Sequence, residues 1–292
     1  MLNMRLEDQA GDVLKKFRFG RKRGVRDISE ASRIDMELFR EIESGEKAPS
    51  QAQLVLLGQT LGFDGTAMAR IHLDPEATPE ITPSAHVLPV QENFSGYAVW
   101  CTLIRHRSDP RRVLLFDTGG GGEILRETIR THGLHIEGIL LTHGHEDHGG
   151  GLYGIPTALN APVLLSEADR PLLPEISRAK GPLFNPEEGC DFLRIRGWPV
   201  STIAAPGHTP GSVAYLMDRT LLVGDTIFCG SAGRCFSPEH FLTQLGSIHR
   251  LISGSLPETV IISGHGPFTT PSQERSFNPF VRVRESMPEL FT

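Results

Sequence analysis

A polar, glycine-rich turn carries four side chains that can bind metal ions. It follows the apolar run 139–141, which is typical of a short buried strand. Neutral imidazole and carboxylate are the usual protein ligands of zinc and related divalent ions. His143 and His145, two residues apart, can share one ion. Asp147 and His148 are the next two candidates, and they turn toward a second ion nearby.

Further candidate ligands occur downstream, each directly after a predicted strand. His208 lies in the segment 206–212, Asp225 lies between Gly224 and Thr226, and His265 lies between two glycines. The recurrence of imidazole and carboxylate at strand ends indicates a metal site assembled from distant parts of the chain.

These motifs, in this order, resemble the metallo-β-lactamase superfamily over about residues 85 to 284. The resemblance implies an α/β fold, an αββα sandwich with the metals at the shared edge of two sheets. It also implies two divalent ions. The first would be held by His143, His145 and His208, the second by Asp147, His148 and His265, with Asp225 bridging both.

Such a pair of ions suits hydrolysis. Two divalent cations lower the pKa of a water held between them and polarise a carbonyl or phosphoryl oxygen of the substrate. Asp147 is the candidate catalytic residue, because a carboxylate beside that water can accept its proton. Histidine and carboxylate ligands suit zinc, iron and manganese alike. We expect zinc, with iron or manganese as alternatives.

The segments around Asp225, Gly233 to Phe236 and His265 are similar to the glyoxalase II-like branch, which hydrolyses thioesters such as hydroxyacylglutathione. Arg234 matches the basic residue of that branch, so it would hold a substrate carboxylate, or it is a surface arginine. The stretch after His265 is too short for the helical substrate-binding domain of glyoxalase II, so we expect a small thioester or ester. Lactonases, phosphodiesterases and persulfide dioxygenases of the superfamily are the alternatives.

The chain divides by pattern into two domains and a linker. Residues 1–73 show successive helical patterns, among them 27–33, 36–44 and a helix that opens after Ser50. Residues 74–84 carry three prolines among small and acidic residues, which indicates a linker. From residue 85 to 292, strands alternate with helices, as expected for sheets covered by helices.

The segment 28–50 resembles the phage-repressor (XRE) type of helix-turn-helix. In that fold the second helix enters the major groove of DNA, which would place Met36, Glu37 and Arg40 against the bases. The basic segment 15–26 would then contact phosphates, or it is a solvated face. The alternative is a helical module for dimerisation or for covering the catalytic domain.

The composition limits the classes of protein to which the chain can belong. The 292 residues are 39% hydrophobic and 22% charged, as in a soluble globular protein, and the net charge of −6 argues against general coating of nucleic acid. No signal peptide or membrane-length apolar run is visible. The four cysteines form no Cys-x-x-Cys pair, which favours reduced thiols and a cytoplasmic location.

Two hypotheses follow. The first is a dinuclear metallohydrolase with an appended helical domain, acting on a small molecule. The second is a transcriptional regulator that uses the metal domain as a ligand sensor. A repressor-like module makes a homodimer the expected assembly.

Overall fold

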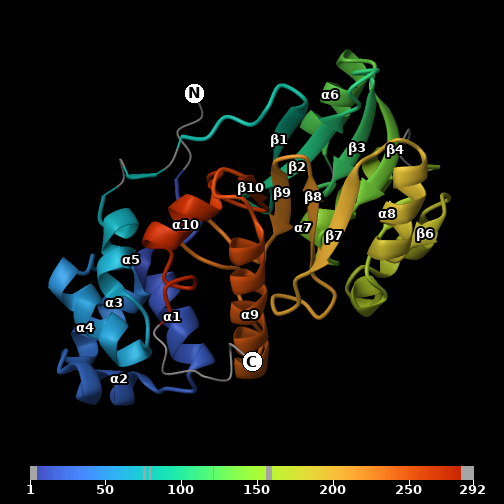
Figure 1. Cartoon of the computed structure of the whole chain (residues 1–292). Coiled ribbons are helices and arrows are strands. Elements are labelled where there is room, and N and C mark those ends of the chain that lie inside the picture. The colour runs from blue at the N-terminus through green and yellow to red at the C-terminus, as the bar shows by residue number, and fades with distance from the viewer. Residues whose placement is uncertain (1–4, 75–76, 79, 121, 156–159, 284–292) are drawn as a thin grey trace.

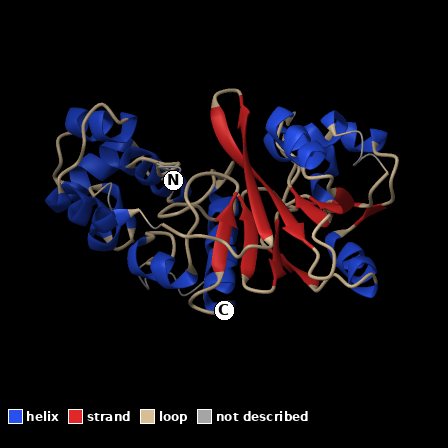
Figure 2. Ribbon diagram, turned by 90° about the horizontal axis from the view of Figure 1, so that it is seen from above, coloured by secondary structure: helices blue, strands red, loops and turns tan. Residues whose placement is uncertain are grey.

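Two β-sheets packed face to face form the centre of the molecule. The computed structural model describes residues 5–74, 77–78, 80–120, 122–155 and 160–283. Helices cover the outer sides of the sheets, and a group of N-terminal helices lies beside the sandwich (Figures 1 and 2). The predicted α/β class and αββα arrangement are confirmed.

The larger sheet has six strands in chain order, of which β1 and β2 are antiparallel and β3 to β6 are parallel to one another. They are β1 (Val87–Phe94), β2 (Tyr97–Arg105), β3 (Arg112–Phe116), β4 (His135–Leu140), β5 (Val163–Leu164) and β6 (Leu183–Phe184). The smaller sheet has the order β10-β9-β8-β7. Its strands are β7 (Val200–Ala204), β8 (Val213–Met217), β9 (Thr220–Gly224) and β10 (Val260–Ser263).

The β1–β2 hairpin is absent from the sequence-based prediction, although its turn has a readable signal. Ser95 and Gly96 both have positive φ, 51° and 94°, as a tight two-residue hairpin turn requires. The Asn93 side-chain oxygen accepts a hydrogen bond from the Gly96 N–H at 3.0 Å. Pro89 is tolerated inside β1 because this strand lies at the edge of the sheet.

Three layers of apolar side chains hold the sandwich together. Phe116 and Leu140 of one sheet meet Tyr215 and Leu222 of the other in the central layer. On the outer side of the six-stranded sheet, the layer includes Leu125 and other residues of α6 (Glu123–Thr131). The remaining helices of the sandwich are α7 (Glu146–Gly149), α8 (Pro186–Ile195), α9 (Pro238–Gly254) and α10 (Pro271–Phe277).

The N-terminal region is helical, as predicted. Its helices are α1 (Ala10–Gly20), α2 (Val25–Ser32), α3 (Met36–Ser44), α4 (Gln51–Leu61) and α5 (Gly65–His72). Gly45 ends α3 in the left-handed conformation, with φ 81°, and the Ser50 hydroxyl caps α4 by accepting from the Gln53 N–H. Part of the predicted linker, residues 75–76 and 79, lies outside the described residues.

The N-terminal helices and the sandwich share one hydrophobic core. Helix α9 lies between α1 and the four-stranded sheet (Figure 1), and apolar side chains of all three belong to a single buried cluster. The centroid of the fully buried Phe17 ring of α1 lies 4.5 Å from the ring centroids of Phe63 and Phe280 and 5.4 Å from the ring centroid of Phe241 in α9. The helical region is therefore attached to the sandwich by side-chain packing as well as by the linker.

Polar contacts strengthen the same junction. Arg282, after α10, donates to the Asp64 carboxylate at 2.7 and 2.9 Å, and a β-bridge joins Phe63 to Val283. The His72 ring nitrogen Nε2 lies 3.1 Å from the Gly230 carbonyl oxygen, in the loop between β9 and α9. The loop that follows Asp225 is thus fixed against α5.

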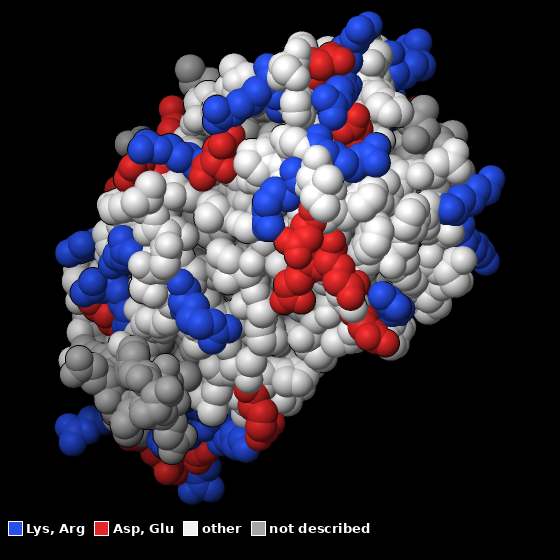
Figure 3. Space-filling view, turned by 45° about the vertical axis from the view of Figure 1, so that its right-hand side comes forward, with Lys and Arg blue, Asp and Glu red and all other residues white. Residues whose placement is uncertain are grey.

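The surface carries both charges. On the face drawn in Figure 3, basic side chains are scattered and acidic side chains gather near the middle. Among the described residues, no helix combines the length and apolar character needed to cross a membrane.

The shared core generates a prediction about stability. Replacing Phe17 by alanine should lower the free energy of unfolding by about 3–5 kcal/mol, because a fully buried ring leaves a cavity. Since this ring touches both parts of the molecule, thermal denaturation should remain a single transition at a lower temperature. Phe19→Ala is the matched control, because Phe19 is 42% exposed. Two separate transitions, with only one shifted, would contradict the shared core.

Candidate metal centre

The seven predicted ligands come together at one end of the two sheets. His143 and His145 lie in the turn after β4, and Asp147 and His148 lie on the short helix α7. The other three follow β7, β9 and β10 of the smaller sheet, namely His208, Asp225 and His265. Residues more than a hundred positions apart thus meet at the shared edge of the sandwich.

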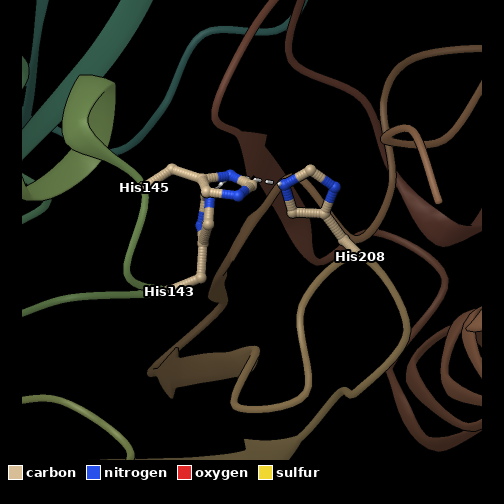
Figure 4. A group of neighbouring side chains, drawn as sticks. All are labelled: His143, His145 and His208. Atoms are coloured by element: carbon tan, nitrogen blue, oxygen red, sulfur yellow. Dashed lines mark hydrogen bonds between the residues drawn. The ribbon is translucent and has the colours of Figure 1, made fainter. Parts of the chain in front are cut away.

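A first group consists of three imidazoles. His143 Nε2 and His208 Nε2 each lie 3.0 Å from His145 Nδ1. Figure 4 shows the three rings directed toward one another, two from the turn after β4 and one from the loop after β7. The nitrogen atoms of this group lie within 4.8 Å of one another, close enough to surround a single ion.

A second group contains His148, Asp225 and His265, whose ligand atoms also lie within 4.8 Å of one another. Asp147 borders this group, with Oδ2 at 3.4 Å from His265 Nε2 and 3.8 Å from His148 Nε2. Ligand atoms of His143, Asp147 and His148 also lie within 4.8 Å of one another, so Asp147 and His148 are close to both groups.

Asp225 lies between the two groups. Its Oδ1 is 3.3 Å from His148 Nε2, and its Oδ2 is 3.6 Å from both His208 Nε2 and His265 Nε2. One carboxylate therefore reaches imidazoles of both groups, which is the geometry that a bridging ligand needs.

Neighbouring acceptors fix the orientation of three rings. His208 Nδ1 is 2.8 Å from the Arg234 carbonyl oxygen, and His265 Nδ1 is 2.6 Å from the Ala98 carbonyl oxygen. His148 Nδ1 lies 2.8 Å from an Asp117 carboxylate oxygen. Each acceptor holds the proton on Nδ1, so the lone pair of Nε2 points into the site.

Asp117 connects the imidazoles to the turn that carries them. Besides contacting His148, it accepts hydrogen bonds at 2.8 Å from the Thr142 N–H and hydroxyl. Asp117 thus braces the histidine turn.

Within the two ligand groups, two buried side-chain atoms have no hydrogen-bond partner among the described residues. They are His148 Nε2 and Asp225 Oδ1, both directed into the second group. An unpartnered buried polar atom costs free energy unless it has a ligand. A divalent cation would satisfy both atoms, so the residues fit a metal ion.

The electrostatics of the two groups also suit cations. Burial lowers the pKa of His143 and His208, which keeps these imidazoles neutral, as metal ligands must be. In the second group, burial opposes charge on His265, but the Asp225 and Asp147 carboxylates raise the pKa of this imidazole to about 9. The carboxylates therefore create a field that favours positive charge.

Asp169 is a supporting residue that the sequence analysis missed. This fully buried carboxylate accepts hydrogen bonds from Gly144 N–H at 3.0 Å, Gly211 N–H at 2.7 Å and the Thr209 hydroxyl at 2.6 Å. It thus joins the turn of His143 and His145 to the loop of His208. Gly211 must be glycine here, because an added Cβ would lie 2.6 Å from Asp169 Oδ1.

A cavity of about 750 Å³ opens onto the ligands. Asp147, His208, Asp225 and His265 line it. Arg234, the predicted substrate-binding residue, also lines the cavity. Its side chain is exposed, and its guanidinium lies 5.7 Å from the centroid of the Phe236 ring.

The predicted DNA-contacting residues lie away from this cavity. Met36, Glu37 and Arg40 are exposed on α3, and Arg40 pairs with Glu37 at 3.2 Å. The Asp35 carboxylate caps α3 by accepting from the Glu37 and Leu38 N–H groups.

The role of Asp169 can be tested without an activity assay. Asp169→Asn would direct an amide NH₂ at backbone N–H donors, so it should loosen both ligand-bearing segments and weaken metal binding about 10–100-fold. Competition with a chelator measures this loss, at a temperature where circular dichroism shows the variant folded. Asp191→Asn, at a largely exposed carboxylate paired with Arg194, is the control. Equal affinities of both variants would remove the bracing role.

Comparison with known proteins agrees with this geometry. The family model described as "Metallo-beta-lactamase superfamily" matches residues 95–265. A probable metallo-hydrolase of Bacillus subtilis, YqgX, is 37% identical over 185 residues, which cover 58% of this chain and 87% of that protein. The hydroxyacylglutathione hydrolase GloC of Haemophilus influenzae is 29% identical over 200 residues, covering 63% of this chain and 93% of GloC.

Solved structures show the same fold. BLEG-1, a B3 metallo-beta-lactamase, superposes with a TM-score of 0.55 at 29% identity, covering 66% of this chain and 99% of BLEG-1. TTHA1623 in a di-iron-bound form superposes with a TM-score of 0.51 at 29% identity and the same coverages. The sandwich, the clustered imidazole and carboxylate groups and the family match lead to one conclusion: the chain belongs to the metallo-beta-lactamase superfamily.

Proposed function

We propose that this superfamily hydrolase is a dinuclear enzyme that cleaves a small thioester or ester, with all seven clustered side chains as metal ligands. The observation that carries the proposal is the position of Asp225, within 3.6 Å of imidazoles from both groups. A carboxylate shared in this way suits two neighbouring cations. The similarity to GloC, named a hydroxyacylglutathione hydrolase, supports a thioester as the substrate.

The metals and the protein have separate tasks in this proposal. Divalent ions bound there would supply Lewis acidity, which lowers the pKa of a water and polarises the acyl carbonyl. The identity of the ions stays open, since these ligands suit zinc, iron and manganese. The protein holds the ligands in the correct tautomers through Arg234, Ala98 and Asp117.

Asp147 is the proposed proton acceptor. Its side chain is 25% exposed, the largest exposure among the carboxylates of the site, and it lines the cavity. In hydrolysis, the water oxygen bonds to the acyl carbon, a water proton passes to Asp147, and the carbon–sulfur bond breaks. The departing thiolate can then take a proton from Asp147 or solvent.

Arg234 is the proposed anchor for a substrate carboxylate. It lines the cavity, and no ion pair occupies its guanidinium among the described residues. A guanidinium can bind a carboxylate through two parallel hydrogen bonds, which orients as well as attracts the substrate.

Loss of a ligand should abolish both metal binding and turnover. The wild type should contain about two ions per chain, and His145→Ala and Asp225→Ala should contain fewer. Their kcat/KM on acyl thioesters should fall by more than about 100-fold, because even the hydrogen-bond partners of metal ligands contribute about 10–100-fold. Elemental analysis and a thioester assay measure the two effects.

His135→Ala is the matched control, since this exposed histidine lies on β4 far along the strand from the turn. Hydrolysis of a lactone or a phosphodiester, but not of thioesters, would change the substrate class. Wild type and ligand variants with the same rate on every substrate would refute the enzyme assignment of the site.

DNA binding through α3 is a second candidate. One observation favours it: α2 and α3 are joined by a turn of residues 33–35, and Met36, Glu37 and Arg40 are exposed on the second helix. In this reading, the metal domain would act as a ligand sensor, and a homodimer would present two such helices. The acidic character of α3 weighs against the reading, because carboxylates repel phosphates.

Arg40→Ala tests this candidate. If α3 binds DNA bases, the substitution should weaken binding to a DNA fragment from upstream of this protein's own gene by about 1–3 kcal/mol. Raised salt should weaken DNA binding by the wild type. An electrophoretic mobility shift measures both effects. A wild type that binds no DNA even at low salt removes the candidate.

A further inference from the structure

Helix α1 forms part of the wall of the cavity that the ligands line. Asp147, Asp225 and His265 line this cavity, and so do residues of α1, among them Lys15 and Phe19. Its volume of about 750 Å³ is within the range of sites for drug-sized small molecules and larger than an acyl group needs. A substrate that fills it therefore extends from the metals to α1.

This wall is rigid with respect to the metal centre. The Lys16 ammonium of α1 pairs with Asp8 and donates to the Ala232 carbonyl oxygen at 2.7 Å, and the Ser231 hydroxyl donates to Asp8. Ser231 and Ala232 belong to the loop that begins at Asp225. Phe17, one residue after Lys16, is buried in the shared core. Groups on α1 thus keep a fixed position relative to the ligands, as a specific binding site requires.

Four basic side chains line the cavity, and two of them are already paired. Lys16 is held by Asp8 and Ala232, and Arg18 by Glu43 at 2.6 and 2.8 Å. Lys15 and Arg234 make no hydrogen bond or ion pair through their charged groups with any described residue. Lys15 comes from the helical wall and Arg234 from the loop that precedes α9.

Acidic side chains of the cavity do not neutralise Lys15 by a direct contact. Asp8 is occupied by Lys16 and Ser231, and Asp12 accepts a hydrogen bond from the Gln9 N–H at 3.0 Å. Glu7 lies next to Gly266, adjacent to the ligand His265. Phe19, four residues after Lys15, shares its helix face and lines the same cavity with an exposed ring.

From these observations we propose that α1 is part of the substrate site, where Lys15 binds an anionic group at the end of the substrate remote from the scissile bond. The inference rests on the proposed hydrolase function and specifies its substrate class. The substrate is a thioester or ester whose far end carries a carboxylate, apart from any carboxylate that Arg234 binds nearer the metals. Phe19 supplies apolar contact to the chain between the two ends.

Two matched substrates test the inference, the S-acetyl derivatives of 6-mercaptohexanoate and of hexanethiol, which differ in the terminal carboxylate. In the metal-loaded wild type, KM should be lower for the carboxylate. Lys15→Ala should raise that KM about 10-fold, the effect expected from loss of one hydrogen bond to a charged group, and leave kcat unchanged. KM for the neutral substrate should not change, and Lys15→Arg should retain most of the preference. Lys47→Ala, at a lysine outside the cavity that pairs with Glu41, is the control.

A binding experiment separates the two levels of the proposal. Calorimetry of 6-mercaptohexanoate with the metal-loaded protein requires no turnover, and Lys15→Ala should weaken this binding about 10-fold as well. If the wild type hydrolyses neither substrate but 6-mercaptohexanoate binding depends on Lys15, the thioester function fails and the anion site stands. If the wild type hydrolyses both substrates and Lys15→Ala changes neither KM nor binding, the function stands and the role of α1 is wrong. Absence of 6-mercaptohexanoate binding in the wild type also overturns the anion site.

Discussion

The burial of Asp225 among imidazoles is the constraint on which the rest of the structure depends. A carboxylate removed from water is costly unless charges and donors surround it. Here burial opposes ionisation, but His265 and His148 hold the pKa of Asp225 well below its usual range. The buried carboxylate is stable only if the loops hold His265 and His148 at these positions beside it. Asp117 links the histidine turn to the His148 ring, and Asp169 links the same turn to the loop that carries His208.

The sequence predicted the part of this site that local patterns determine. His143 to His148 follow an apolar strand, and His208, Asp225 and His265 follow others; the resemblance to the metallo-β-lactamase superfamily singled out these seven side chains, and the structure brings them together. Asp169 escaped because it lies in a short 3₁₀ helix of an irregular segment, and only the fold brings it to Gly144 and Gly211. The role of such a buried carboxylate is tertiary and leaves no periodic signal.

The basic segment at the N-terminus shows the same limit. By sequence, Lys16, Arg18 and Lys22 are equivalent members of a charged run. In the structure Lys16 and Arg18 are paired inside the molecule, and Lys22 contacts Glu239 in an exposed pair of little energetic value. Which cations remain available depends on partners far along the chain. Lys15, which has none among the described residues, is exposed and is one of the residues that line the cavity.

The shared core also bears on the choice between an enzyme and a ligand-controlled regulator. A sensor needs two arrangements of α1 and α3, and a full population switch requires a differential binding free energy of about 5.5 kcal/mol. Moving α1 away from α9 and from the segment after α10 would break the contacts of Phe17 with Phe241 and Phe280, at about 1.5–3 kcal/mol for each ring exposed. Helix α3 packs closely on α1, where a Cβ added to Gly11 would lie 2.4 Å from the Ile42 carbonyl oxygen. A small ligand that gains one or two hydrogen bonds to α1 cannot offset that cost. The same contacts suit a helix that acts as a fixed wall, so the packing favours a catalytic domain whose substrate cavity is completed by the N-terminal helices.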